Sequence, residues 1–430
     1  MKVHFIQQDP WVAPGEYLAW AERNGWAVSR TRCWRHEAVP QAAEADLLVV
    51  LGGHQSPATT KAECETFDAA AQRALILEYV QAGRMVVGVC LGAQLVGEAL
   101  GAPYGRSPEK EIGPVAARLT PAGRADPFLR DFPDAFFAGE WHNDMPGLTP
   151  DAEVLAVSEG CPRQIVRYGR YVYGFQAHME FTREIVAAGI EDAGGEIRQR
   201  GPFIQSAAAL LACDYTGMNR LLSSFLDAMA ADYAARRRLG RQLAFALEID
   251  KEKNVFRQTH LSEGGRREND AEHAWHMAIM AWLLREYANE RVDIARVMLM
   301  CLIHDIVEID AGDTYAYDAE GQKTRKARED AAKARIFSLL PEDQAARLTA
   351  LFDEFEAFQT PEAKFAHSMD NLQPLLLNDS NGGGDWKAHG VTAETVYGRQ
   401  GKTRLGSEKL YEVTDEIIQA NIRKGNLPER

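Results

Sequence analysis

The segment Met85–Leu100 reads MVVGVCLGAQLVGEAL and joins an apolar β-type run to a helical run at a single cysteine, Cys90. The small residues Gly88 and Gly92 flank that junction and permit a sharp strand-to-helix turn. Such a turn holds a nucleophile above a strand end, and the N-terminus of the following helix favours the thiolate. Backbone N–H groups at the same turn can stabilise an oxyanion. We therefore expect Cys90 to act as a nucleophile.

Strand-like and helical stretches alternate on both sides of this segment. Buried strands are predicted at Lys2–Gln7 and Asp46–Leu51, and amphipathic helices at Glu16–Asn24 and Glu65–Ala82. Gly and Pro bound three later β-rich runs: Glu153–Ser158, Arg163–Tyr168 and Tyr171–Gln176. Alternation of this kind is typical of a mostly parallel sheet with helices on both faces, so we expect an α/β fold for the N-terminal half.

The chain changes character after Phe181, where the β-type pattern ends and helical periodicity takes over. Predicted helices cover nearly all of the remaining sequence: Arg183–Glu191, Ile204–Ala212, Met218–Ala235, Gln242–Ile249, Glu272–Asn289, Ile294–Glu308, Lys323–Leu339, Gln344–Glu356, Pro361–Leu377 and Ser407–Arg423. The basic run Arg236-Arg237-Arg238 is interpreted as a solvated helix end or linker. We therefore predict two domains, an α/β domain over residues 1–236 and an all-α domain over residues 237–430.

Composition and charge narrow the functional classes. The chain has 430 residues, of which 46% are hydrophobic and 26% charged, as in a globular protein of two or three domains. A formal net charge of −14 disfavours nucleic-acid binding, which needs a basic face. No apolar run approaches the roughly 20 residues that cross a bilayer, and residues 1–8 lack a signal-peptide pattern, so no membrane association is expected. The six cysteines form no CxxC pair, which favours a reducing, cytoplasmic environment.

A cysteine nucleophile needs a base, and the base needs a group that orients it. The segment Gly174–Glu180, GFQAHME, places His178 and Glu180 two residues apart after a predicted strand. Either feature alone is commonplace, because a single cysteine is usually a buried structural thiol. Their combination with Cys90 predicts an amidase-type active site.

Residues 1 to about 235 resemble the class I glutamine amidotransferase family. The matching segments are Leu51–Gly53, Gly88–Gln94, Glu111–Gly113, Trp141–Asp144 and Gly174–Glu180. The resemblance implies a flavodoxin-like α/β fold, with Cys90 as the nucleophile, His178 as the general base and Glu180 as its orienting carboxylate. The implied reaction is attack on a side-chain amide, release of ammonia and hydrolysis of the glutamyl thioester.

The same resemblance assigns the surrounding groups. It implies that the N–H groups of Gly53 and Leu91 form an oxyanion hole and that Gln94 helps to hold the substrate glutamine. Two nearby histidines, His54 and His142, are interpreted as hydrogen-bonding residues of loops, with a place in the substrate pocket as the alternative for His142. Relatives that hydrolyse other γ-glutamyl bonds leave the identity of the amide open.

The C-terminal half carries histidines and carboxylates within apolar helical stretches, at His273, His304-Asp305 and Asp370. Charged groups in such surroundings need partners or a metal ion. His304 and Asp305 are adjacent on a predicted apolar helix, Val297–Ile306, which is sensible if both bind one cation. Two imidazoles and two carboxylates suit a divalent transition metal and leave positions open for water and substrate.

Residues from about 240 to 425 resemble the HD-domain metal-dependent phosphohydrolases, most closely the branch that dephosphorylates deoxynucleoside monophosphates. The segments that carry the resemblance are Asn269–His273, His304–Glu308 and Asp370–Leu376. It implies one divalent cation, without distinguishing Mn, Co, Zn, Mg or Fe. The residues that it implies are the ligands His273, His304, Asp305 and Asp370, the acid/base and water-positioning carboxylates Glu308 and Asp313, and a phosphate-binding arginine, Arg257 or Arg266.

Other features of this half are given structural interpretations. His276, one turn from His273, is interpreted as a packing residue or a support behind the ligands. The glycine run Asn381–Trp386 lacks the ending of a phosphate-binding loop and is predicted to be a flexible loop. Trp275, Trp282 and Leu283 recur at helical spacing and are predicted to lie in the core.

We therefore expect a bifunctional cytoplasmic hydrolase acting on small molecules: glutamine or a γ-glutamyl compound, and a nucleotide. No ammonia-consuming motif is recognisable, so ammonia would be released or passed to a separate acceptor enzyme; a homo-oligomer is left open. One alternative makes the amidase-like domain a metabolite sensor that regulates the hydrolase, although a sensor needs no nucleophile such as Cys90. Another makes the HD site an oxygenase, for which His276 is the one spare histidine.

Overall fold

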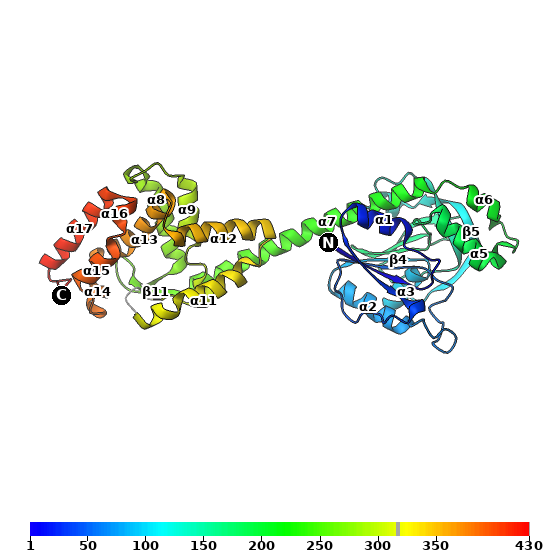
Figure 1. Ribbon diagram of the computed structural model, residues 1–430, viewed down its shortest axis with the longest axis horizontal. Helices are drawn as coiled ribbons and strands as arrows, with labels where there is room; N and C mark the ends of the chain where they lie inside the picture. Colours follow the sequence, from blue (N-terminus) through cyan, green and yellow to red (C-terminus); the bar gives the residue numbers. More distant parts are fainter. Residues whose placement is uncertain (315–318, 430) are drawn as a thin grey trace. The chain divides into compact units, whose positions relative to one another are not determined.

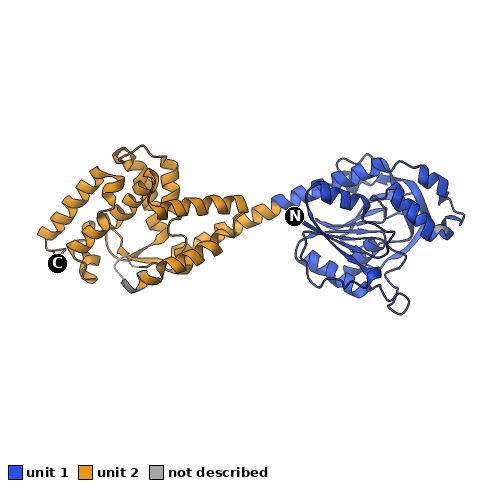
Figure 2. Cartoon of the chain, in the orientation of Figure 1, with its two compact units in different colours: residues 1–235 blue, residues 236–430 orange. Residues whose placement is uncertain are grey.

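The computed structural model describes residues 1–314 and 319–429. It divides into two compact units, unit 1 (Met1–Ala235) and unit 2 (Arg236–Arg430) (Figure 2). Unit 1 has two hydrophobic clusters, one on each face of its sheet, and unit 2 has its own hydrophobic core. Among the described residues, no helix combines the length and apolar character that crossing a bilayer requires.

Unit 1 is built on a ten-stranded sheet whose order is β10-β5-β7-β8-β9-β4-β3-β1-β2, with β6 paired to β5. Pairing is parallel from β2 through β1, β3 and β4 to β9, and antiparallel from β9 through β8, β7 and β5 to β6. The strands are β1 (Lys2–Gln7), β2 (Ala27–Arg32), β3 (Leu47–Val50), β4 (Met85–Val89), β5 (Gly105–Leu119), β6 (Ala135–Met145), β7 (Glu153–Ser158), β8 (Ile165–Gly169), β9 (Val172–Phe175) and β10 (Phe203–Ile204).

Helices cover both faces of this sheet because successive strand side chains point to opposite sides. Phe5 packs with residues of α1 and α7 in one core, whereas its neighbour Ile6 packs with residues of α2 and α3 in another. Figure 1 shows α1 and α7 on one side of the sheet and α2 and α3 on the other. The helices of this unit are α1 (Gly15–Arg23), α2 (Ala69–Gln81), α3 (Leu91–Ala99), α4 (Pro121–Ala125), α5 (Arg183–Ile197), α6 (Ala207–Ala212) and the first part of α7 (Thr216–Glu248). The predicted α/β fold with a mostly parallel sheet is confirmed.

Helix α7 crosses the boundary between the units. Its residues Leu222, Phe225 and Leu226 are fully buried in the core of unit 1, and Phe245 belongs to the core of unit 2. The basic run 236–238 therefore lies within a continuous helix, and Arg238 pairs with Asp343 at 2.6 Å.

The described residues of unit 2 form helices and one antiparallel hairpin, β11 (Phe256–His260) and β12 (Arg267–Asn269), which the sequence pattern did not predict. The short strand β10 of unit 1 was missed in the same way. The helices of unit 2 are α8 (Asp270–Leu284), α9 (Ile294–Ile303), α10 (Glu308–Ala311), α11 (Ala319–Phe337), α12 (Glu342–Ala357), α13 (Pro361–Ser380), α14 (Gly384–Ala388), α15 (Ala393–Gln400), α16 (Thr403–Gly406) and α17 (Glu408–Arg423).

Two predictions about helices in unit 2 are wrong. The apolar helix α9 ends at Ile303, so His304 and Asp305 lie in the turn that follows it and not within the helix. Trp275, Trp282 and Leu283 do not lie in the core: their exposed fractions are 62%, 50% and 55%. The physical reason is that α8 buries its alanine and methionine face, which allows close helix packing and directs the large side chains outward.

The glycine run at 381–386 is a turn followed by a short helix. Gly382 and Gly383 both adopt φ of +72°, a conformation that glycine tolerates, and α14 begins at the next residue. The turn therefore serves to reverse the chain after α13.

Candidate active sites

Cys90 lies at the end of β4, directly before α3, with φ of +52°. A positive φ is uncommon for a residue other than glycine and marks local strain. The Cys90 N–H donates to the Phe175 carbonyl at 2.7 Å, which ties the turn to β9. Gly92 is required here because a Cβ at this position would lie 1.8 Å from the Val50 carbonyl oxygen. The turn thus holds the cysteine at the carboxyl end of a central parallel strand.

His178 and Glu180 follow β9, the strand beside β4, and both are buried. The His178 Nδ1 atom lies 2.7 Å from Glu180 Oε1, and the imidazole stacks on Phe181 at 4.3 Å between ring centres. Burial by itself lowers the pKa of His178, but the Glu180 carboxylate and the Cys90 sulfur raise the pKa to about 10. The imidazole is therefore held in its charged form beside the cysteine at neutral pH.

A small pocket of about 120 Å³ opens onto Cys90. Its lining includes the other residues that the sequence pointed to: Gly53, Leu91, Gln94, His142 and His178. Gln94 is buried, and its Nε2 donates to Gln176 Oε1 at 3.2 Å, so its amide is held in one orientation. His54 also lines the pocket, where its Nε2 lies 2.6 Å from Asp192 Oδ2 at the exposed rim.

A buried charged cluster beneath this pocket was not anticipated. His142 Nε2 lies 3.1 Å from both Glu111 Oε2 and Glu140 Oε2, and all three side chains are almost fully buried. Burial lowers the pKa of His142, whereas the hydrogen bonds to the two carboxylates raise it to about 9. Burial raises the pKa of Glu140 to about 7.

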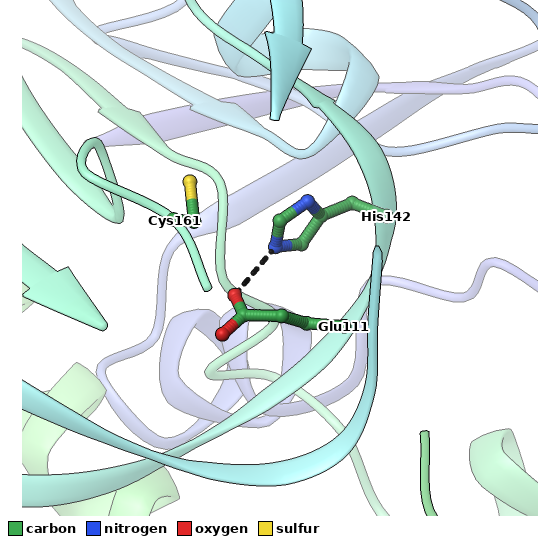
Figure 3. Close-up of side chains that lie close together, drawn as sticks. All are labelled: Glu111, His142 and Cys161. Atoms are coloured by element: carbon green, nitrogen blue, oxygen red, sulfur yellow. Dashed lines mark hydrogen bonds and ion pairs between the residues drawn. The ribbon is translucent and has the colours of Figure 1, made fainter. Parts of the chain in front are cut away.

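Glu111, His142 and Cys161 lie close together, yet they suit a hydrogen-bonded support better than a metal ion (Figure 3). The Glu111 carboxylate already accepts hydrogen bonds from Ser158 at 2.7 Å and from Gln164 at 2.6 Å, besides its contact with His142. Because Glu111 and His142 come from paired strands β5 and β6, sequence spacing alone could not bring them together.

In unit 2, three helices bring the four expected metal ligands together. His273 is on α8, Asp370 is on α13, and His304 and Asp305 follow α9. His273 Nε2 lies 3.3 Å from Asp370 Oδ1, and His304 Nε2 lies 3.1 Å from Asp305 Oδ2. The two cross distances are 4.0 Å from His273 to Asp305 and 3.9 Å from His304 to Asp370. The ligand atoms of His273, His304 and Asp305 therefore lie within 4.8 Å of one another, and Asp370 Oδ1 lies within 4 Å of both imidazoles.

Hydrogen bonds behind the two imidazoles leave their Nε2 atoms available to a cation. His273 Nδ1 lies 2.9 Å from Gln373 Oε1, and His304 Nδ1 lies 2.9 Å from the Cys301 carbonyl oxygen. Because both oxygens can only accept, each Nδ1 carries the hydrogen and each Nε2 keeps its lone pair. Within the described residues, His304 Nε2 is buried without a hydrogen-bond partner. A divalent metal ion fits this donor set.

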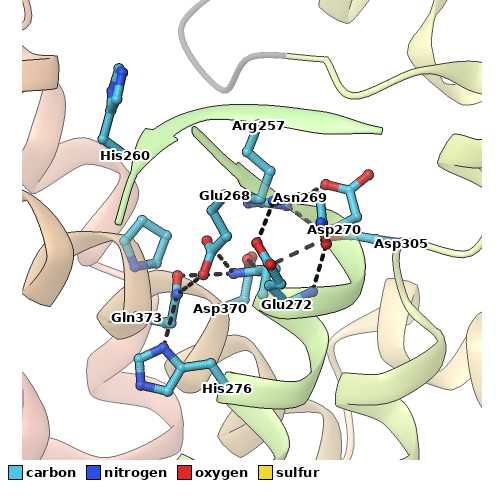
Figure 4. Close-up of polar contacts among 12 residues, drawn as sticks. Arg257, His260, Glu268, Asn269, Asp270, Glu272, His276, Asp305, Asp370 and Gln373 are labelled. Carbon is cyan, nitrogen blue, oxygen red and sulfur yellow. Dashed lines mark hydrogen bonds and ion pairs between the residues drawn. The ribbon is translucent and has the colours of Figure 1, made fainter. Parts of the chain in front are cut away.

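Gln373 is the main support of this arrangement, and sequence reasoning missed it. Its Nε2 donates to Glu268 Oε1 at 2.7 Å and lies 3.1 Å from His276 Nδ1 (Figure 4). The donation to a carboxylate fixes the amide orientation, so the oxygen must face His273. His276 therefore lies behind the ligands, on the far side of Gln373, and does not add a further ligand for an oxygenase.

Carboxylates and arginines surround the ligands. Arg257, on β11, donates from Nη1 to Asp305 Oδ2 at 2.7 Å and to Asp270 Oδ1 at 3.5 Å. Burial, followed by the charge of Asp305, raises the pKa of Asp270 to about 8 and that of Glu308 well above its usual range. Burial and the neighbouring carboxylates thus favour the protonated form of Glu308 beside the ligands.

A pocket of about 460 Å³ opens onto this site. Arg257, Glu308 and Asp313 line it, but Arg266 does not, because its guanidinium forms a bidentate pair with Glu272 at the surface. Three basic side chains that sequence reasoning missed also line the pocket: Arg325, Arg399 and Lys402. No local motif marks them, since they lie on segments far from the ligands in sequence.

Comparison with known proteins finds a matching family for each half of the chain. The class-I glutamine amidotransferase family matches residues 26–187, and the HD domain matches residues 249–411. The chain is 49% identical over 239 residues to the glutamine amidotransferase-like protein YfeJ of Salmonella typhimurium, which covers 55% of this chain and 100% of that protein. This chain is also similar to the crystal structure of SMU.1228c, with a TM-score of 0.52 and 46% identity. The match covers 54% of this chain and all of that chain.

The C-terminal half is similar to the human 5'-deoxynucleotidase HDDC2, with 32% identity over 111 residues. That match covers 26% of this chain and 53% of the relative, so the chain spans about half the length of this second relative. The chain therefore belongs to the class I glutamine amidotransferase family through unit 1 and carries an HD domain in unit 2.

Proposed function

We propose that the protein is a bifunctional hydrolase. Unit 1 hydrolyses glutamine or another γ-glutamyl amide with Cys90 as the nucleophile, and unit 2 releases phosphate from a nucleotide such as a deoxynucleoside monophosphate. The observation that carries this proposal is that each unit assembles a complete set of reactive groups from its own elements: the Cys90–His178–Glu180 set in unit 1 and the two-histidine, two-aspartate set in unit 2.

In unit 1, the Cys90 thiolate attacks the amide carbonyl, and the N–H groups of Gly53 and Leu91 stabilise the negative charge on its oxygen. The imidazolium of His178 donates a proton to the departing nitrogen, which leaves as ammonia. The neutral imidazole then accepts a proton from water as the thioester is hydrolysed. Glu180 stabilises the imidazolium before ammonia leaves and again when hydrolysis re-forms it. The pocket of about 120 Å³ is large enough for a small side-chain amide.

In unit 2, His273, His304, Asp305 and Asp370 would hold one divalent cation. When bound, such a cation lowers the pKa of a coordinated water and neutralises phosphate charge. Arg257 lines the same pocket, and we assign it to phosphate binding because a guanidinium suits a phosphate; its Nη1 also donates to Asp305. Glu308, whose protonated form is favoured by burial, donates a proton to the leaving alcohol, and Asp313 positions the attacking water.

The proposed substrates are small molecules, and no nucleic acid or membrane partner is proposed. Ammonia would be released or taken up by a separate enzyme, because unit 2 chemistry does not consume it. The proposed independence of domains 1–236 and 237–430 gives the test. A cut between residues 236 and 237 leaves Phe225 with the core of unit 1 and Phe245 with the core of unit 2, so both pieces should fold.

The two pieces are expressed separately and their melting curves and activities recorded. We expect ammonia release from glutamine only with piece 1–236, and metal-dependent phosphate release from deoxynucleoside monophosphates only with piece 237–430. Two folded pieces that lack both activities, when the intact chain has them, would contradict the proposal.

A further inference from the structure

One face of α13 lines the pocket of unit 2. Four of its residues contribute to that lining: Asn371, Pro374, Leu375 and Asn378. Their positions repeat at the spacing of a single helical face, which we call the α13 face. Asn371 directly follows the expected ligand Asp370, and Asn378 lies two helical turns further on, about 10 Å along the axis. The α13 face therefore leads away from the ligands along the wall of the pocket.

Each asparagine on the α13 face has its amide held in one orientation. Arg399 Nε donates to Asn371 Oδ1 at 3.2 Å, so the free end of that amide is Nδ2. Asn378 Nδ2 donates to the Pro374 carbonyl at 3.0 Å, so the free end of the second amide is Oδ1. Neither amide can be reversed without losing its bond, because a guanidinium only donates and a carbonyl only accepts. The α13 face thus carries a donor near the ligands and an acceptor two turns away.

Both free ends are buried and unpaired. Among the described residues, Asn371 Nδ2 and Asn378 Oδ1 have no hydrogen-bond partner, and each asparagine is only 5% exposed. A buried polar group without a partner costs free energy, and native proteins keep few of them. Since both asparagines line a pocket, a molecule bound there can supply an acceptor to Asn371 and a donor to Asn378.

The far end of the pocket suits a flat ring. The Gly383 N–H, just before α14, donates to the Asn378 carbonyl at 2.7 Å, and Trp386 of α14 lines the pocket. Asp385 lines it as well, but both of its carboxylate oxygens are already hydrogen-bonded to His260. Of these two acceptors, Asn378 Oδ1 is therefore the one left unpaired. An aromatic wall combined with a precisely placed polar atom is a common way to hold a nucleobase.

We propose that Asn378 binds the base of the nucleotide substrate and that Asn371 donates to its phosphate, an inference that rests on the phosphohydrolase activity proposed for unit 2. The α13 face then spans the substrate from phosphate to base, with Pro374 and Leu375 beside the sugar. An acceptor at the base edge favours an exocyclic amino group, as in adenine or cytosine. Thymine and uracil offer only a ring N–H between two carbonyl oxygens, which repel Asn378 Oδ1. The preferred substrate is therefore a deoxynucleoside monophosphate whose base carries an amino group.

The test measures kcat/KM of the full chain, with Mn²⁺ present, for pairs of substrates that differ in one amino group. Deoxyadenosine monophosphate and deoxycytidine monophosphate are each compared with the analogue that lacks the exocyclic amino group. We expect the wild type to prefer the amino form of at least one pair by about ten- to hundredfold, since the analogue leaves Asn378 Oδ1 unpaired.

Two substitutions on the α13 face separate its two ends. Asn378→Leu removes the acceptor, so it should lower kcat/KM for the amino form and abolish the preference. Asn371→Leu acts at the phosphate, which both members of a pair share, so it should lower kcat/KM for both alike and keep the preference. Gln419→Leu, which replaces an exposed amide on α17, is the matched control and should behave as the wild type.

The outcomes distinguish this inference from the activity on which it rests. A wild type that hydrolyses both members of both pairs equally overturns the inference and leaves the phosphohydrolase activity standing, as does an Asn378→Leu protein that keeps the preference. The wild-type comparison needs no substitution, so it decides the inference even where Asn378→Leu does not fold. A wild type that releases no phosphate from any of the four nucleotides contradicts the proposed activity instead. Calorimetric dissociation constants for the same pairs, measured on chelator-treated full chain, then decide the inference: the amino form must bind more tightly, and equal or absent binding overturns it.

Discussion

Replacement of Glu180 by glutamine tests how the cysteine site is charged. The substitution keeps the shape of the side chain but removes the carboxylate that lies 2.7 Å from His178 Nδ1. The rise in the pKa of His178 from 6.5 to about 10 corresponds to roughly 5 kcal/mol in favour of the imidazolium. Without Glu180, burial lowers the pKa of His178 and only the Cys90 sulfur still raises it, so a smaller fraction of the rings stays charged at pH 7.5.

We expect two consequences. Alkylation of Cys90 by iodoacetamide at pH 7.5, followed by mass spectrometry, should slow about tenfold because fewer rings are in the imidazolium form that stabilises the thiolate. Ammonia release should fall by about 10²–10⁴, since the same imidazolium is the proton donor. Glu184→Gln, at an exposed carboxylate in the next helix, is the matched control and should match the wild type.

The same substitution has a signature in stability. A group whose pKa is raised by folding stabilises the folded state fully below its unfolded pKa, here 6.5, and loses that contribution as the pH rises through about 10. The difference in unfolding free energy between wild type and Glu180→Gln should therefore shrink from pH 6.5 to pH 10. Wild-type alkylation and ammonia release in Glu180→Gln at pH 7.5 would refute the account of this site.

Three further substitutions probe the supports of the two sites. Gly92→Ala should lower the unfolding free energy of unit 1 by about 2 kcal/mol or more in a denaturation experiment, because its Cβ would meet the Val50 carbonyl. Gly217→Ala is the control: Gly217 lies on α7 with open space around it, so the substitution should not destabilise the unit. Gln373→Leu should weaken metal binding by about 10–100-fold in a competition titration with a chelator, because it removes the hydrogen bond that orients His273, whereas the exposed Gln419→Leu should bind metal normally. Glu308→Gln should keep its metal by elemental analysis but release phosphate about 10²–10⁴ times more slowly, and a metal-free Glu308→Gln protein would make that residue a ligand.

Features that depend on short stretches of chain were predictable from the sequence. The strand, cysteine and helix of residues 85–100 are contiguous, and so are His178 and Glu180 after β9. The local sequence patterns were therefore sufficient to predict the strand-to-helix turn at Cys90 and the His178–Glu180 pair. The ligands of unit 2 are spread from His273 to Asp370. Their residue types within apolar stretches already indicated a cation site, and the resemblance to the HD family supported the same four ligands.

Features that depend on packing partners were not predictable. The hairpin of β5 and β6 carries charged residues such as Glu111, whose burial becomes sensible only when Ser158 and Gln164 are known to contact it. Arg266 is close to His273 in sequence but pairs with Glu272, whereas Arg399 is distant in sequence and reaches Asp370 at 3.4 Å.

Hydrophobic periodicity led to a wrong prediction for α8, whose two tryptophans were expected in the core. Large apolar residues at helical spacing usually indicate a core face, but α8 carries a second apolar set, of alanine and methionine side chains, and that set is the buried one. Alanine and methionine let this helix approach its neighbours closely, so the two tryptophans are directed outward. Sequence periodicity does not decide which of two apolar faces is buried when both are present.

The central claim is that one chain carries two independent hydrolytic sites, and paired single-site variants of the full chain test it most directly. Ammonia release from glutamine and phosphate release from a deoxynucleoside monophosphate with Mn²⁺ or Co²⁺ are measured for wild type, Cys90→Ala and Asp305→Ala. The account predicts that Cys90→Ala loses only the first activity and that Asp305→Ala loses only the second, together with its metal. A Cys90→Ala protein that still releases ammonia at the wild-type rate, or an Asp305→Ala protein that keeps its metal and its phosphatase activity, would contradict it.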